Sequence, residues 1–300
     1  MSSASTRMTE VATLQQQLTS AGYVAERSFA AALLLMIELG RPLLIEGDAG
    51  VGKTEVAKAL AAVRKTRLIR LQCYEGLDAH AAMYEWNYQR QLLAIKLLEH
   101  DERSVAAKEQ DIFSERYLLK RPLLEAIGCE RPPVLLIDEV DRADEAFEAY
   151  LLELLSDFQM SIPELGTVKA TTVPLVIVTS NGTRELSDAL RRRCLYQYLD
   201  YPSFEKELAI VELRAPDAPA ELARQIVQFV QSARRLELQK KPGVAETLDW
   251  TAALLRLGIT SIGEDGVDER ILETLAALIK TREDRTAFTR EAVARIAAAC

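Results

Sequence analysis

Apolar residues recur along this chain first with a helical period, then in short uninterrupted runs, and finally with a helical period again. Residues 9–39 carry apolar positions at helical spacing, interrupted by Gly22, which predicts two helices that end at Gly40. Short apolar runs alternate with helical stretches beyond that point, and this alternation predicts an α/β fold with a mostly parallel five-stranded sheet flanked by helices. The predicted strands lie at the start of "RPLLIEGDAGVGKT" and at 67–73, 132–140, 171–181 and 194–202.

The pattern changes after Pro202. Four segments beyond it are amphipathic at helical spacing, and they read "SFEKELAIVELRA", "PAELARQIVQFVQSARRLE", "ETLDWTAALLRLG" and "DERILETLAALIKT". No run among them predicts a strand. We therefore expect two domains, an α/β domain over residues 1–202 and a small all-helical domain over residues 203–300.

The charge balance limits the partners. Lysine and arginine total 37 against 45 aspartates and glutamates, which gives a net charge of −8. This argues against a nucleic-acid partner, because duplex-coating proteins gain affinity by neutralising phosphates.

The longest apolar run, 29–37, is far shorter than a bilayer span, so no transmembrane segment is expected. We expect a cytoplasmic protein with reduced thiols and no zinc site, because Cys73, Cys129, Cys194 and Cys300 are widely scattered.

One motif predicts phosphate binding. "GDAGVGKT" at 47–54 fits Gly-x-x-x-x-Gly-Lys-Ser/Thr, with a predicted strand before it and a predicted helix after it. Glycines let the backbone wrap around phosphates, so that N–H groups and the helix N-terminus point at them. In this motif Lys53 reaches the β and γ phosphates and Thr54 ligates Mg²⁺, so ATP and Mg²⁺ are the expected cofactors. The expected binding residues are Gly47, Asp48, Ala49, Gly50, Val51, Gly52, Lys53, Thr54 and Glu55.

Two adjacent carboxylates end the third predicted strand. "VLLIDE" at 134–139 places Asp138 and Glu139 at the carboxyl end of a buried strand, where α/β sheets bind ligands. Together with the phosphate loop they predict that Asp138 holds Mg²⁺ and that Glu139 orients and deprotonates the attacking water. Asn181, at the end of the next strand, either positions the same water through its amide or caps a turn.

In combination these residues resemble the AAA+ ATPases: a phosphate loop, a strand ending Asp-Glu, a strand ending in Asn, arginines a few residues later, and then a helical lid. The resemblance spans roughly residues 20–300. Within that superfamily the chain is similar to the MoxR family, which inserts a hairpin where "MSIPELGTVKATTVPL" stands, near 160–172. The stretches "LQCYEGLDAHAAMYEWNYQRQLLAIK", "FSERYLLKRPLLEAI" and "KKPGVAETLDW" look most like its CoxD-like branch.

The resemblance implies an assembly and an activity. It implies a homo-oligomeric ring, usually a hexamer, that binds ATP between subunits and uses hydrolysis to remodel a client protein. MoxR proteins typically work beside a partner with a von Willebrand factor A domain. The CoxD-like branch implies a metalloenzyme client, matured at a metal centre such as that of molybdenum–copper carbon monoxide dehydrogenase.

Three consecutive arginines follow the fourth strand. Arg191, Arg192 and Arg193 stand about ten residues past Asn181, where the resemblance implies an arginine that reaches the γ-phosphate of a neighbouring subunit. A guanidinium suits that task because it is planar, permanently charged and able to bond two phosphate oxygens. Arg192 and Arg193 are the preferred fingers, and the alternative is a solvated basic turn.

Two further features leave alternatives open. Tyr84, Trp86 and Tyr88 follow the second strand, where AAA+ rings line their central pore, so they either grip a client or pack against the core. The arginine that MoxR lids commonly place near the nucleotide is absent from "PGVAETLDW", and Lys240, Lys241 and Arg256 are its candidate substitutes.

The leading functional hypothesis is an ATP-driven chaperone in metalloenzyme assembly. A second is a MoxR-like activase of the rubisco or gas-vesicle type. A third is a nucleotide-gated assembly module without productive hydrolysis, against which Glu139 argues. A DNA helicase or loader is the weakest candidate because the chain is acidic and has no basic DNA-binding appendage.

Overall fold

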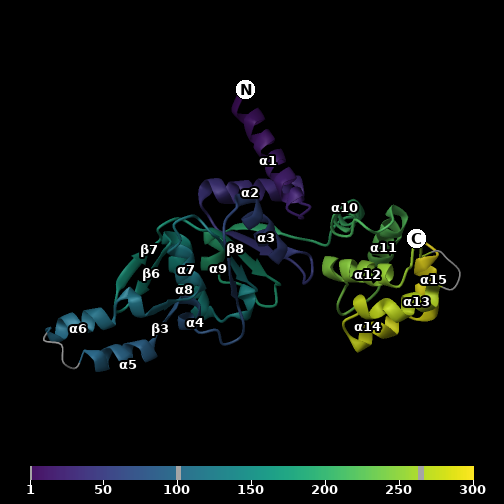
Figure 1. Cartoon of the computed structure of the whole chain (residues 1–300). Coiled ribbons are helices and arrows are strands. Elements are labelled where there is room, and N and C mark those ends of the chain that lie inside the picture. Colours follow the sequence, from purple (N-terminus) through teal and green to yellow (C-terminus); the bar gives the residue numbers. More distant parts are fainter. Residues whose placement is uncertain (1, 99–102, 263–266) are drawn as a thin grey trace. The chain divides into compact units, whose positions relative to one another are not determined.

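The computed structural model describes residues 2–98, 103–262 and 267–300, which form two compact units (Figure 1). The sheet unit comprises Arg27–Glu46 and Ala57–Tyr198. The helical unit comprises Met1–Glu26, Gly47–Val56 and Leu199–Cys300. The phosphate loop and the first helix therefore group with the C-terminal helices. The division into domains 1–202 and 203–300 stays a prediction.

Five strands form the central sheet, and the predicted fold class is confirmed. All four neighbouring pairs are parallel, in the order β2-β5-β8-β1-β9. Because the strands are parallel, their carboxyl ends lie together at one end of the sheet, and this is where the acidic residues fall. The strands are β1 (Leu43–Glu46), β2 (Leu68–Gln72), β5 (Val134–Asp138), β8 (Leu175–Ser180) and β9 (Leu195–Tyr198).

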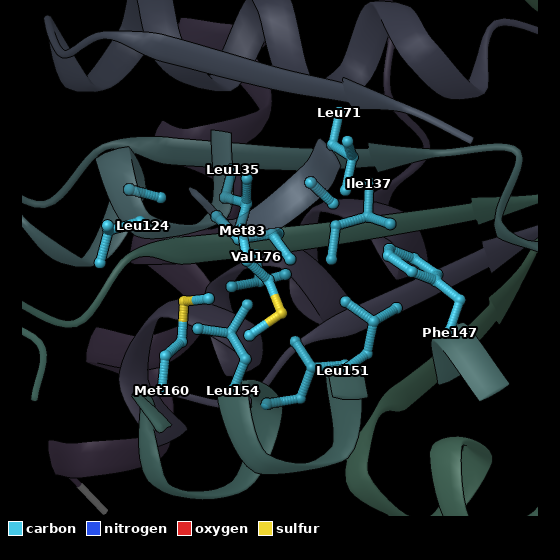
Figure 2. Close-up of a cluster of buried hydrophobic side chains, with 14 of the residues drawn as sticks. Leu71, Met83, Leu124, Leu135, Ile137, Phe147, Leu151, Leu154, Met160 and Val176 are labelled. Atoms are coloured by element: carbon cyan, nitrogen blue, oxygen red, sulfur yellow. The ribbon is translucent and has the colours of Figure 1, made fainter. Parts of the chain in front are cut away.

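The central strand β5 is buried along its whole length, as an uninterrupted apolar run predicts. Successive side chains of a strand face opposite sides, and Leu135 and Ile137 point into the same apolar cluster. In Figure 2 these side chains face Phe147, Leu151 and Leu154 of helix α8 (Glu145–Asp157). This packing fixes the end of β5, and so the position of Asp138.

A long insertion separates β2 from β5. Its two short strands, β3 and β4, pair antiparallel, and no pattern in the sequence predicted them. Helices α5 and α6 lie side by side away from the sheet in Figure 1. The insertion consists of α4 (Ala79–Met83), β3 (Tyr84–Trp86), α5 (Tyr88–Leu97), α6 (Val105–Ile112), the 3-10 turn Glu115–Tyr117, β4 (Leu118–Lys120) and α7 (Pro122–Ile127).

The remaining elements of the sheet unit connect its strands. A 3-10 turn, Val140–Arg142, follows β5, and β6 (Gln159–Ile162) pairs antiparallel with β7 (Gly166–Lys169) where the hairpin insert is expected. Helix α2 (Arg27–Leu39) packs on β1 and β9, and α9 (Asp188–Arg193) leads into β9. Helix α3 (Lys53–Arg64) starts in the helical unit and ends in the sheet unit.

The helical unit has a separate apolar core, in which the Phe229 and Trp250 rings lie 4.8 Å apart. Its elements are α1 (Ser2–Ser20), α10 (Phe204–Arg214), α11 (Ala220–Ala233), α12 (Val244–Arg256), α13 (Val267–Thr274), the 3-10 turn Leu275–Ala277, α14 (Arg282–Ala287) and α15 (Arg290–Ala297). Across the described ranges, no helix combines the length and apolarity needed to cross a membrane.

Candidate nucleotide site

The phosphate loop begins one residue after β1 and ends where α3 begins. Gly50 and Gly52 have φ values of 81° and 97°, a conformation that side chains rarely adopt. A Cβ at Gly47 would lie only 2.1 Å from the carbonyl oxygen of Leu199. Lys53 is 6% exposed and donates from Nζ to the carbonyl oxygens of Gly47 and Asp48, at 2.7 Å each. A buried ammonium group held by a glycine-rich loop fits a polyphosphate ligand.

The loop also contacts the start of helix α12 within the helical unit. The backbone N–H of Val244 donates to the carbonyl oxygen of Gly50 at 2.9 Å. Glu246 accepts from the N–H of Gly243 at 2.9 Å, and a Cβ at Gly50 would approach its Oε2 to 3.1 Å. The stretch "PGVAETLDW", which lacks the expected lid arginine, thus contacts the phosphate loop. It places the carboxylate of Glu246 beside Gly50. Arg256 lies at the opposite end of α12.

Asp138 ends β5 and is 2% exposed. Its Oδ1 accepts from the hydroxyl of Thr179 at 2.6 Å, and its Oδ2 accepts from Nε and Nη2 of Arg70 at 3.1 and 2.6 Å. One carboxylate oxygen therefore already faces a positive charge. This arrangement fits a residue that holds a divalent cation through Oδ2 while Thr179 fixes its other oxygen.

Glu139 follows directly and has a left-handed backbone, with φ of 55° and ψ of 51°. This conformation is uncommon for a residue with a side chain, and the backbone N–H of Glu139 is held by Thr179 Oγ1 at 2.9 Å. Its Oε1 accepts from Asn181 Nδ2 at 3.3 Å, and its Oε2 pairs with Arg142 at 3.2 Å. The structure thus brings Asn181 to Glu139, as the water-positioning hypothesis requires.

Four residues around this acidic pair were missed in the sequence: Arg70, Gln72, Thr179 and Asp141. Gln72 lies opposite Asp138 in the strand register and donates from Nε2 to Glu139 Oε2 at 3.1 Å. The available signal was the polar side chains of Arg70 and Gln72, which alternate with apolar residues along β2. The sequence does not reveal the register between β2 and β5. That register is what brings Arg70 and Gln72 into contact with Asp138 and Glu139.

Two ionisable groups beside the pair have shifted pKa values. Burial acts to raise the pKa of Asp141, but hydrogen bonds from Thr183 and from the backbone N–H of Asn181 outweigh it, so the pKa lies below its ordinary value. Burial, with the nearby carboxylates of Asp138, Asp141 and Glu139, raises the pKa of the Cys73 thiol to about 12. Cys73 therefore acts as an apolar core residue and not as a nucleophile.

The three arginines form the last turn of α9 and have different surroundings. Arg191 faces the carboxylate of Glu46 at 3.6 Å, which is a partner inside the same chain. Arg193 donates to Ser156 Oγ and, at 3.0 Å, to the carbonyl oxygen of Ala189. Arg192 is exposed; its carbonyl oxygen accepts from Arg41 at 2.7 Å, and no described residue pairs with its guanidinium. Of the two preferred fingers, Arg192 is the one oriented to solvent.

The aromatic residues after β2 do not share one environment. Tyr84 and Trp86 are 4% and 6% exposed, and the Trp86 ring packs edge-on against Phe113 at 5.5 Å. Tyr88 is 64% exposed. Two of the three candidate pore residues thus pack in the core, and Tyr88 is the exposed one of the three.

The glycine-rich loop after β1 and the Asp-Glu pair at the end of β5 define a P-loop nucleotide-binding protein of the α/β class. The family model described as "AAA domain (dynein-related subfamily)" matches residues 42–194, and the chain belongs to this family.

Relatives with known names are distant. The gas vesicle ATPase GvpN of Haloferax mediterranei is 25% identical over 66% of this chain and 58% of GvpN. The denitrification regulatory protein NirQ of Stutzerimonas stutzeri is 26% identical over 74% of each chain. The chaperone protein ClpB of Chlamydia trachomatis is 28% identical over 54% of this chain and 17% of ClpB. The chain thus spans less than two thirds of GvpN and of ClpB.

These comparisons agree with the AAA+ and MoxR-type part of the resemblance. None of them singles out the CoxD-like branch, which stays a prediction.

Proposed function

We propose that this protein hydrolyses ATP with Mg²⁺ and uses the energy to remodel a client protein. The observation that carries the proposal is the contact of Asn181 with Glu139 beside Asp138, at the carboxyl ends of two neighbouring strands. Membership of the AAA family supports nucleotide binding and ATPase activity in general. Coupling to a client is the part of the proposal that rests on resemblance.

Each residue has a role in this proposal. The loop Gly47–Thr54 binds the phosphates through its backbone N–H groups and Lys53, and Thr54 and Asp138 hold Mg²⁺. Mg²⁺ held there would supply positive charge to offset the charge that develops on the phosphates. Glu139 accepts a proton from the attacking water, and Asn181 holds Glu139 and that water in place. Arg192 contacts the γ-phosphate bound by the next subunit, which makes the protein active as a ring.

The client class has two candidates. Metalloenzyme maturation follows from the CoxD-like stretches of the sequence, with carbon monoxide dehydrogenase as the model case. The match to a gas vesicle ATPase favours the second candidate, an activase of the gas-vesicle type. A hexameric ring, a partner with a von Willebrand factor A domain and a cytoplasmic location belong to the same proposal.

Phosphate release by the purified protein tests the enzymatic part. Wild type should turn over ATP, and Glu139→Gln should lose most of that turnover, by about 10²- to 10⁴-fold, while still binding nucleotide. Glu145→Gln, in the exposed first turn of α8, is the matched control and should keep full turnover. A wild-type protein that binds ATP without hydrolysing it would point to the nucleotide-gated assembly module.

A pull-down tests the remodelling part separately. Glu139→Gln protein with ATP should hold its client longer than wild type does, because hydrolysis no longer releases it. Recovery of a metalloenzyme subunit would support the first client class, and recovery of a gas vesicle component the second. A protein that hydrolyses ATP and retains no client would contradict remodelling while leaving the ATPase proposal intact.

A further inference from the structure

Arg70 contacts the carboxylate that the proposed function assigns to Mg²⁺. It lies on β2, next to β5 in the sheet, two residues before the position opposite Asp138. Its Nε and Nη2 both donate to Asp138 Oδ2, at 3.1 and 2.6 Å. The oxygen that would bind a metal ion is therefore the oxygen that Arg70 neutralises.

The two partners differ in burial. The side chain of Asp138 is 3% exposed, whereas that of Arg70 is 50% exposed. A buried carboxylate without a compensating charge is costly, so Asp138 needs a cation whether or not nucleotide is bound. A half-exposed guanidinium can leave its partner at low cost, because water solvates it once it turns outward. Arg70 thus neutralises Asp138 but remains displaceable.

We propose that Arg70 is a resident cation that occupies Asp138 in the nucleotide-free protein and competes with Mg²⁺ for Oδ2. The inference rests on the proposed Mg²⁺–nucleotide site. Arg70 is a positioning residue in this account, since it acts through Asp138. The protein keeps its acidic pair neutralised until a nucleotide brings Mg²⁺, and each binding event displaces the arginine.

The displacement reaches the second acidic residue through Gln72. Arg70 Nη2 also donates to Gln72 Oε1, and the amide of Gln72 donates to Glu139 Oε2 at 3.1 Å. When Arg70 leaves Asp138, Gln72 loses the donor that orients its amide. Arrival of the cation at Asp138 therefore changes the hydrogen bonding of Glu139 on the same strand end.

Binding of a fluorescent ADP analogue, titrated with Mg²⁺, tests the competition without hydrolysis. Arg70→Ala should lower the Mg²⁺ concentration for half-maximal binding by about three- to tenfold, because the ion no longer displaces a charge. Arg70→Lys should stay near the wild-type midpoint. Arg67→Ala is the matched control: this arginine precedes β2, pairs with Glu125, and should leave the midpoint unchanged.

Thermal unfolding gives a second readout. Arg70→Ala should melt below wild type in EDTA, because Asp138 has lost its ion pair with Arg70, and close to wild type with Mg²⁺ and the ADP analogue. If the alanine variant does not fold, Arg70→Gln takes its place in both measurements. An unchanged or higher Mg²⁺ midpoint in a folded variant overturns the competition. A wild type that binds no nucleotide overturns the proposed function first, so the two failures are distinguishable.

Discussion

At the scale of single residues, one hydroxyl positions both members of the acidic pair. Thr179 donates to Asp138 Oδ1 and accepts from the backbone N–H of Glu139, at 2.6 and 2.9 Å, and it is fully buried. The second bond holds the backbone of Glu139 in its left-handed conformation. A single side chain on β8 thus contacts both acidic residues of the proposed hydrolytic site.

The lowered pKa of Asp141 predicts that the stability of the protein depends on pH. Its folded pKa lies below the ordinary value of 3.8, so the carboxylate contributes stability above about pH 4 that is lost as pH falls through the folded pKa. Asp141→Asn should therefore be less stable than wild type at pH 7, and the difference should shrink below about pH 4. Urea unfolding at a series of pH values measures it.

The control for this prediction is Asp157→Asn, which removes an exposed carboxylate of the same unit. A difference between wild type and Asp141→Asn that stays constant from pH 7 to pH 3 would show that the carboxylate charge does not matter.

The sequence identified the residues with local signatures and missed those that depend on pairing. The loop containing Lys53 and the strand ending in Asp138 were predictable because motif and apolar run are contiguous. Arg70 and Gln72 were not, because their role depends on which strand lies beside β2 and in what register. The partner of Arg191 was missed for the same reason, since Glu46 is distant in sequence.

At the scale of elements, helical periodicity located the long helices well. Helix α11 lies inside the predicted amphipathic segment, because a wide apolar face is visible without knowledge of what covers it. The short strands β3 and β4 left no such signal, since three residues are too few for a period to show. The three arginines directly precede the predicted strand at 194–202, and in the structure they end a short helix capped by Ser187.

A buried network joins three helices of the helical unit. Glu207 on α10 is fully buried and accepts from Nη1 and Nη2 of Arg234 at 2.6 Å each, from Thr247 Oγ1 at 2.7 Å and from Gln231 Nε2 at 2.8 Å. Arg234→Met should cost about 3–5 kcal/mol in the free energy of unfolding, because it leaves a buried carboxylate unpaired. Denaturant unfolding measures that loss.

Two further variants sharpen this prediction. Adding Glu207→Leu to Arg234→Met should recover part of the lost stability, because both buried charges are then gone. Arg290→Met breaks an exposed ion pair with Glu269 and should cost at most about 1 kcal/mol. If Arg234→Met also lost no more than about 1 kcal/mol, the buried network would add little to the free energy of unfolding.

At the scale of the whole molecule, the question is whether one chain is sufficient for activity, and exposed Arg192 is the residue that addresses it. Arg41, two residues before β1, donates to the backbone carbonyl oxygen of Arg192, while the residue itself is exposed to solvent. A fixed backbone with an exposed, permanently charged end suits a residue that works on a neighbour's ligand. Arg191 and Arg193, which bond within their own chain, suit that role less well.

Mixing two inactive variants tests the trans role. Arg192→Ala keeps its own phosphate loop and lacks the finger, and Lys53→Ala keeps the finger and lacks phosphate binding. Rings that contain both place an intact Arg192 next to an intact loop at some interfaces, so phosphate release should recover in part when the two are mixed. Arg193→Ala, whose guanidinium bonds to Ser156 in its own chain, should keep more activity alone than Arg192→Ala does. Mixed rings, verified by differential tagging, that show no recovery would place Arg192 outside the neighbour's site.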